Sequence, residues 1–165
     1  LSAHKGKVMQ NPAALFRTFS QVPVLGPELF SRAVSFMAPY FATISPRFLV
    51  LEPGYAEVAM KNRRAVHNHI GTVHAIAMCN LCEALAGTMI EATLPKTLRW
   101  IPRGMTVRYL KKADTNLVAQ GRMDTPAPDF VGDVVIPVQV FNTRGEVVME
   151  ADISMYVSLH KSAKA

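Results

Sequence analysis

Residues 74–92 constrain this chain more than any other segment, because they form an almost unbroken apolar run of about five helical turns. Its apolar side chains fall on all sides of a helical wheel, which is typical of a helix surrounded by protein. Between positions 75 and 90 only one charged residue, Glu83, interrupts the pattern. Burial of a carboxylate is costly unless it is paired or protonated. We therefore expect Glu83 to have either a dedicated partner or a chemical role.

The composition is that of a single folded domain. Of the 165 residues, 50% are hydrophobic and 18% are charged, which argues against disorder. No apolar run reaches the ~18–20 residues of a membrane span, because Asn80, Glu83 and Gly87 interrupt the longest one. Residues 1–10 show no signal-peptide pattern and the chain has only two cysteines, so we expect a cytoplasmic protein that does not bind membranes.

Hydrophobic periodicity predicts an α+β fold around this helix. After a lead-in at 1–10, helices are expected from Asn11-Pro12 and from Pro27 to about Tyr40. Period-two alternation then predicts strands at 47–52, 55–61, 104–112, 117–123, 131–142 and 146–159, with a polar tail at 161–165. A curved antiparallel sheet wrapped around the single long helix buries most of it, and pairing of two such units would complete the burial.

Glu83 and His74 are the two strongest candidates for chemistry. Burial would raise the pKa of Glu83 and suit it to act as a base or nucleophile. The structural alternative is a carboxylate paired with an arginine, or one bonded by Asn80 three residues earlier. His74 lies nine residues before Glu83, which is ~13–14 Å along a helix. The two can share one site only if a two-fold-related copy supplies one of them.

The loop 68–74 places polar groups at the start of the helix. Free N–H groups at His74 and Ala75, with the positive end of the helix dipole, favour a developing oxyanion. Asn68 can donate to a carbonyl oxygen or position water, and Gly71 allows close backbone approach. Each residue also has a simpler interpretation: Asn68 as a turn residue, Gly71 for its positive φ, and His74 as a helix cap.

The net charge of +6 suits an anionic ligand such as a nucleotide or coenzyme A, although charge alone favours a solvated basic surface. No zinc-finger, RNP or helix-turn-helix signature points to nucleic acid.

The cluster His67, His69 and His74 lacks a nearby Cys or carboxylate, so no metal site is expected. Cys79 and Cys82 form a C-x-x-C in mid-helix, where two buried structural thiols are favoured over a redox pair. G-x-S-x-G, P-loop and G-x-G-x-x-G motifs are absent.

The pattern Asn68-x5-His74-Ala75-x7-Glu83 resembles the active-site pattern of hotdog-fold acyl-CoA thioesterases of the phenylacetate-pathway (PaaI-like) branch. In that branch an Asn or Gln lies six residues before a His-Gly-Gly that opens the central helix, and an Asp or Glu lies nine residues after the His. Residues 73–75 and 81–87 match this register without a gap. The resemblance covers a hotdog core at about 44–159, preceded by an N-terminal helical lead-in at 1–43, in one domain spanning 1–165.

The resemblance implies a homodimer, or a dimer of dimers such as a homotetramer, with each site between two subunits. Glu83 would be the general base or nucleophile, the N–H of Ala75 would polarise the thioester carbonyl, His74 would shape the site, and Asn68 would orient carbonyl or water. Acyl-CoA is then the substrate, with no separate cofactor. Further substrate-binding residues are expected to be Gly71, Thr72, Asn80, Arg108, Lys111 and Lys112.

Ala75 is a departure from the family pattern, which usually has Gly there. The backbone N–H is retained, and the added methyl restricts the approach of the thioester.

Two other functions stay open. One is a non-catalytic acyl-CoA or lipid-binding module in which Glu83 is structural. The other is a hydratase or dehydratase on the same fold, which would need a His/Asp dyad that cannot be assembled from this sequence.

Overall fold

The computed structural model describes residues 11–23 and 25–160. The predicted lead-in at 1–10 and the polar tail at 161–165 lie outside the described residues. The elements follow one another as α1 (Pro12–Ser20), α2 (Leu25–Met37), η1 (Pro39–Thr43), β1 (Arg47–Glu52), β2 (Tyr55–Met60), η2 (Arg64–Val66), α3 (Ala75–Thr93), β3 (Leu98–Tyr109), β4 (Leu117–Arg122), β5 (Gly132–Asn142) and β6 (Val147–Leu159).

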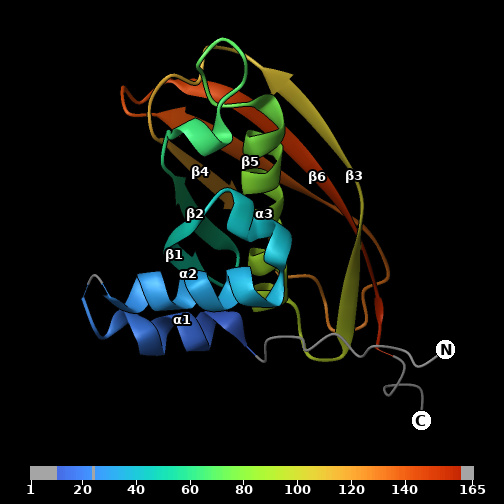
Figure 1. Cartoon of the computed structure of the whole chain (residues 1–165). Helices are drawn as coiled ribbons and strands as arrows, with labels where there is room; N and C mark the ends of the chain where they lie inside the picture. The colour runs from blue at the N-terminus through green and yellow to red at the C-terminus, as the bar shows by residue number, and fades with distance from the viewer. Residues whose placement is uncertain (1–10, 24, 161–165) are drawn as a thin grey trace, which may run out of the picture.

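The six strands form one antiparallel sheet in the order β1-β2-β4-β5-β6-β3, which curves around α3 (Figure 1). This confirms the predicted α+β architecture, with one long helix held in a curved sheet. β1 and β3 are the two edges of the sheet. The position of β3 matters for function, since its outer edge has no strand partner among residues 11–23 and 25–160.

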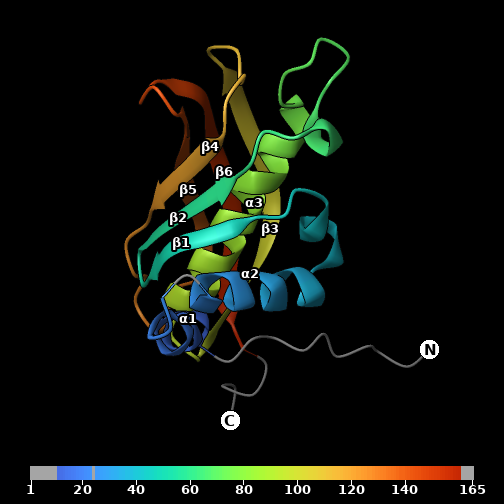
Figure 2. The same ribbon diagram turned by 60° about the vertical axis from the view of Figure 1, so that its left-hand side comes forward.

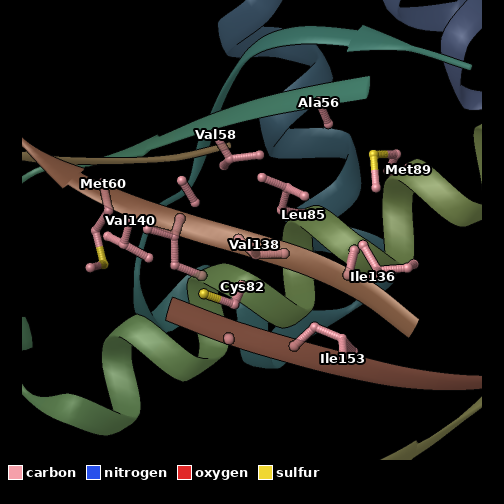
Figure 3. Packing of buried hydrophobic residues seen from close by; sticks show 14 of the residues in the cluster. Ala56, Val58, Met60, Cys82, Leu85, Met89, Ile136, Val138, Val140 and Ile153 are labelled. Atoms are coloured by element: carbon pink, nitrogen blue, oxygen red, sulfur yellow. The ribbon is translucent and has the colours of Figure 1, made fainter. Parts of the chain in front are cut away.

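The core lies between the inner face of the sheet and α3. Cys82, Leu85 and Met89 of α3 are fully buried against inward-facing side chains of β2 and β5, such as Val58 and Val138 (Figure 3). By length and composition alone α3 could cross a membrane, but 61% of its most apolar 18-residue stretch is buried inside the protein. It is thus the core helix of a folded domain.

One glycine allows β4 to approach this helix closely. A Cβ atom on Gly121 would lie 2.6 Å from Cδ2 of Leu85 and 3.3 Å from Cγ2 of Val138. The Leu85 side chain would have to shift to make room for this Cβ atom. The absence of a side chain at Gly121 therefore lets Leu85 of α3 pack directly on β4.

The N-terminal helices and the loop before α3 lie at opposite ends of the domain. α1 and α2 pack together near the C-terminal end of α3, and the loop 61–74 lies at the other end (Figures 1 and 2). As predicted, Asn11 caps α1, its Oδ1 accepting the N–H of Ala14 at 3.1 Å. α2 ends at Met37 rather than near Tyr40, because Pro39 starts the separate 3-10 helix η1.

β3 differs most from the prediction, which placed a strand at 104–112. The strand begins at Leu98 and ends at Tyr109. The strand includes Pro102 and Gly104, with a local register shift opposite β6 between them. A proline is tolerated here because β3 is an edge strand. The other five strands and α3 agree with the predicted bounds to within one residue at each end.

Candidate functional site

The loop before α3 is held together by Asn68. Its Oδ1 accepts the N–H groups of Ile70 and Thr72, both at 3.1 Å, and its Nδ2 donates to Oγ1 of Thr72 at 2.8 Å. Gly71 has φ of +78°, a conformation that favours glycine. The structure thus shows Asn68 as a turn residue and Gly71 as a positive-φ residue, which are the simpler interpretations of the two. One hydrogen of the Asn68 amide is still available to a ligand.

His74 is the N-cap of α3. Its Nδ1 accepts the N–H of Ile76 at 3.0 Å, and its carbonyl oxygen accepts those of Ala77 and Met78 at 3.0 and 3.2 Å. The neutral ring that accepts at Nδ1 carries its proton on Nε2. The N–H of Ala75 makes no hydrogen bond to any described residue. It is therefore the free donor at the positive end of the helix.

Glu83 is exposed in the single chain, so the burial expected from the sequence is not provided by its own chain. Its carboxylate makes no hydrogen bond or ion pair with any residue of 11–23 or 25–160. The alternative of an arginine partner is not found within those ranges either. The reason for the exposure is that the sheet covers only part of α3 and leaves a stripe open at Ile76, Cys79, Glu83 and Gly87.

This stripe runs beside β3, and we call the two together the α3–β3 face. Sγ of Cys79 lies 3.4 Å from the hydroxyl of Tyr109, and Nε1 of Trp100 donates to Glu91 at 2.7 Å. The contact with Cys79, more than burial, raises the pKa of Tyr109 to about 12. Ile76 is 55% exposed on this face. An unpaired edge strand next to an exposed apolar stripe is a surface suited to association.

The two cysteines differ in environment. Cys82 is buried, and the loss of solvent raises the pKa of its thiol to about 12. Cys79 is only partly buried, because it belongs to the α3–β3 face, so the prediction of two buried thiols holds for Cys82 alone.

The suggested hydrogen bond between Asn80 and Glu83 does not form, because the Asn80 amide donates to residues of η1 instead. Asn80 is 5% exposed, and its Nδ2 donates to the carbonyl oxygen of Tyr40 at 3.3 Å and to Oγ1 of Thr43 at 3.2 Å. It lines a pocket of about 190 Å³ between η1, η2 and the first turns of α3, which His74 and Ile76 also line. Periodicity alone gave no signal for this pocket, because the segment 39–43 was not expected to fold back onto α3.

The predicted basic residues do not gather at one place. Arg108 donates to Glu150 at 2.7 Å, on the face of the sheet away from α3, and this contact lowers the pKa of Glu150. Lys111 pairs with Glu146 at 2.6 Å. Lys112 is exposed, has no partner among the described residues, and precedes Ala113, whose carbonyl accepts the N–H of Val73 at 2.9 Å. Of the three, Lys112 is thus the free cation next to the loop that opens α3.

Within 11–23 and 25–160, no three His, Cys, Asp or Glu side chains lie close enough together to hold a metal ion. Nε2 of His67 instead lies 2.5 Å from Oδ1 of Asn62.

Comparison with known proteins identifies the family. A family model described as a domain of unknown function, DUF4442, matches residues 26–157, which is most of the chain. The chain belongs to the DUF4442 family. No curated protein matches this DUF4442 chain in sequence.

Solved structures similar to the DUF4442 chain share its fold. The structural-genomics protein APC5556 is 46% identical, with a TM-score of 0.79 over 90% of this chain and 99% of that one. A protein of unknown function from Pseudomonas aeruginosa, described as a probable thioesterase, is 23% identical, with a TM-score of 0.72 over 81% and 95%. A hypothetical thioesterase from Streptococcus pneumoniae, solved with coenzyme A, is 20% identical, with a TM-score of 0.60 over 70% and 87%. The predicted hotdog fold and the resemblance to thioesterase-family proteins are confirmed.

Proposed function

We propose that this chain hydrolyses an acyl-CoA thioester, converting R–CO–S–CoA and water into R–COOH and HS–CoA. One observation carries the proposal: α3 holds the exposed, unpartnered carboxylate of Glu83 and the free N–H of Ala75 at the register of the thioesterase pattern. An unpaired acid supplies a base or nucleophile, and a free helix N-terminus stabilises an oxyanion. Thioesterase-family proteins of the same fold support this choice.

The two groups belong to different subunits in this proposal. They are ~12 Å apart along one helix, too far to act on the same carbonyl. A two-fold axis beside the α3–β3 face would set the two α3 helices antiparallel and the two β3 edges side by side. Glu83 of one copy would then approach Ala75 of the other, and the apolar stripe would be covered. A homodimer is thus the smallest catalytic unit.

Each residue then has a distinct role. The N–H of Ala75 donates to the carbonyl oxygen of the thioester, and this bond strengthens as negative charge develops there. Glu83 of the second copy either removes a proton from the attacking water or attacks the carbonyl carbon itself. His74 caps the helix and fixes the N–H, and the remaining amide hydrogen of Asn68 orients carbonyl or water.

The deciding experiment is a panel of acyl-CoA substrates incubated with the purified chain, with release of the CoA thiol as the signal. Turnover of at least one acyl-CoA above the uncatalysed rate is the expected result. Tight binding of acyl-CoA without turnover would instead select the non-catalytic binding module.

Chemical crosslinking tests the proposed dimer. If Ala75 of one helix faces Glu83 of its antiparallel partner, the midpoint falls at position 79, so the two copies of Cys79 flank the axis. Packed helices have axes ~8–10 Å apart, so a bismaleimide linker of similar length should join the two thiols and give a covalent dimer on a denaturing gel.

Cys82 provides the matched control for this crosslink. Its thiol is buried and has a pKa of about 12, so Cys82→Ala should leave crosslinking intact while Cys79→Ala removes it. A dimer in solution that gives no Cys79-dependent product would rule out this arrangement of helices.

Coenzyme A binding should weaken as salt rises, because phosphate pairing with exposed cations is screened. We assign Lys112 to this contact, since it has no acidic partner within the described residues and lies beside the loop before α3. Lys112→Ala should raise KM for acyl-CoA severalfold at low salt and reduce the salt dependence of KM. Arg17→Ala, which removes an exposed cation on α1, should do neither.

A further inference from the structure

We infer that Trp100 limits the length of the acyl group, so that the site takes short acyl chains and excludes fatty acyl chains. The inference rests on the proposed function and names the substrate class of that same site. Trp100 is the only tryptophan in the chain and lies on β3, which runs beside α3 (Figure 1). Its indole lies against α3 at Gly87, about one helical turn beyond Glu83 of the same subunit.

Two contacts fix the position of the indole on α3. Its Nε1 donates to Oε2 of Glu91 at 2.7 Å. A Cβ atom added to Gly87 would lie 3.2 Å from Cη2 and 3.9 Å from Cζ2 of the six-membered ring. The five-membered ring therefore faces the C-terminal end of the helix, and the edge of the six-membered ring lies at Gly87, nearer to Glu83. Because position 87 has no side chain, the ring can lie directly against the helix.

The indole forms a wall close to the proposed base. Trp100 is half-buried and packs against the core, so the ring is held on several sides. Gly87 follows Glu83 by four residues, ~6 Å along the helix. An extended chain advances ~1.2 Å per bond, so an acyl chain that starts at a carbonyl beside Glu83 reaches the ring after roughly five bonds. A longer chain must displace the ring or leave the helix surface.

The acyl group, rather than coenzyme A, is the part of the substrate that runs toward this wall. The carboxylate of Glu91 lies beside the indole, and this part of α3 approaches the negative end of the helix dipole. Both disfavour the phosphates of coenzyme A, and neither opposes an uncharged acyl chain. Lys112, the cation assigned above to coenzyme A, lies beside the loop at the opposite end of α3.

Binding of non-hydrolysable thioether analogues tests this limit without any need for turnover. In each analogue a methylene group separates the acyl carbonyl from the sulfur of coenzyme A, and the acyl group is acetyl, butanoyl, hexanoyl, octanoyl or dodecanoyl. Calorimetry on the wild-type protein should show an affinity that rises to about hexanoyl, because each added methylene buries apolar surface. The affinity should then fall at least tenfold by dodecanoyl, because the longer chain is forced against the ring. An affinity that rises or stays level through dodecanoyl would overturn the inference.

Trp100→Ala should raise the affinity of the dodecanoyl analogue relative to the butanoyl analogue at least tenfold, because it removes the wall. Trp100→Leu keeps apolar atoms against Gly87 and should act in the same direction with a smaller effect. It serves as the second variant if Trp100→Ala does not fold. An unchanged length profile in a folded variant at this position would contradict the role of the ring.

Ile101→Ala is the matched control. Ile101 is the next residue on β3, is 59% exposed and points to the opposite face of the sheet. Its substitution should leave the length profile unchanged. A shift as large as that of Trp100→Ala would show that the effect comes from the strand and not from the indole.

The fluorescence of the single tryptophan distinguishes the two parts of the substrate. Tryptophan emission comes from Trp100 alone, so the hexanoyl analogue, whose chain reaches the ring, should change its intensity or wavelength on binding. Coenzyme A without an acyl group should bind with little change in emission. The full change with coenzyme A alone would place coenzyme A against the indole and overturn the inference.

The length limit and the proposed hydrolysis fail separately. A limit set by Trp100 with no release of coenzyme A from the matching thioesters would remove the thioesterase and leave the inference. Hydrolysis of butanoyl and dodecanoyl thioesters with equal kcat/KM would do the reverse. Absence of binding by every analogue would remove both.

Discussion

Glu83→Gln should lower kcat for thioester hydrolysis on the order of 10²- to 10⁴-fold, the range expected for loss of a general base, with KM little changed. Glutamine has the shape of glutamate but carries no charge. The substitution breaks no ion pair, because the Glu83 carboxylate has no partner among the described residues. The melting temperature should therefore stay close to that of the wild type. Steady-state release of the CoA thiol and a thermal melt measure the two effects.

Glu52→Gln is the matched control, since Glu52 is also exposed, has no bonded partner within the described residues, and lies on β1 at the opposite edge of the sheet. It should retain wild-type turnover. If Glu83→Gln were as active as Glu52→Gln, Glu83 would be a surface residue and the proposed reaction would lose its base.

Local patterns predicted most of this fold. Side chains of a strand point alternately to its two faces, and one face of β6 meets the core. The alternation of Val147, Met149 and Ala151 in the sequence therefore predicts this strand directly. The long apolar run likewise located α3 to within one residue at each end. β3 was placed less well because Pro102 and Gly104 usually end strands, and only the partner strand shows that the chain continues through them.

The parts of the site that escaped prediction depend on contacts between distant residues. An apolar segment predicts that a helix will be covered, but it does not say whether its own chain or a second copy provides the cover. Glu83 was expected to be buried, with a second copy completing the cover of the helix, and it faces solvent in one chain. Asn80 bonds residues 37 and 40 positions earlier, a pairing that no local spacing encodes.

Ala75→Pro should reduce hydrolysis by about 10²- to 10³-fold, as expected when one oxyanion donor is lost, and should leave the fold intact. The first position of a helix accepts proline, since the N–H lost there has no intrahelical acceptor. His74, the preceding residue, has φ of −65° and ψ of 138°, a conformation compatible with a following proline. The substitution therefore removes the proposed catalytic N–H with little change to the helix.

Ala75→Gly keeps the N–H and is the control: it should retain turnover while Ala75→Pro does not. Circular dichroism and the melting temperature should be similar for both variants. A fully active Ala75→Pro protein would show that this N–H does not contact the thioester carbonyl.

Mixing the two inactive variants tests whether each site is shared between subunits. In a heterodimer of Glu83→Gln and Ala75→Pro, one site contains both substitutions and the other contains neither, provided that Glu83 and Ala75 come from different chains. After random exchange of subunits, half of the dimers are heterodimers with one intact site each, so activity should return to about a quarter of the wild-type value. If Glu83 and Ala75 served the same site within one chain, every site in the mixture would lack one of the two groups. Activity would then stay at the level of the separate variants, because no exchange of subunits could restore it.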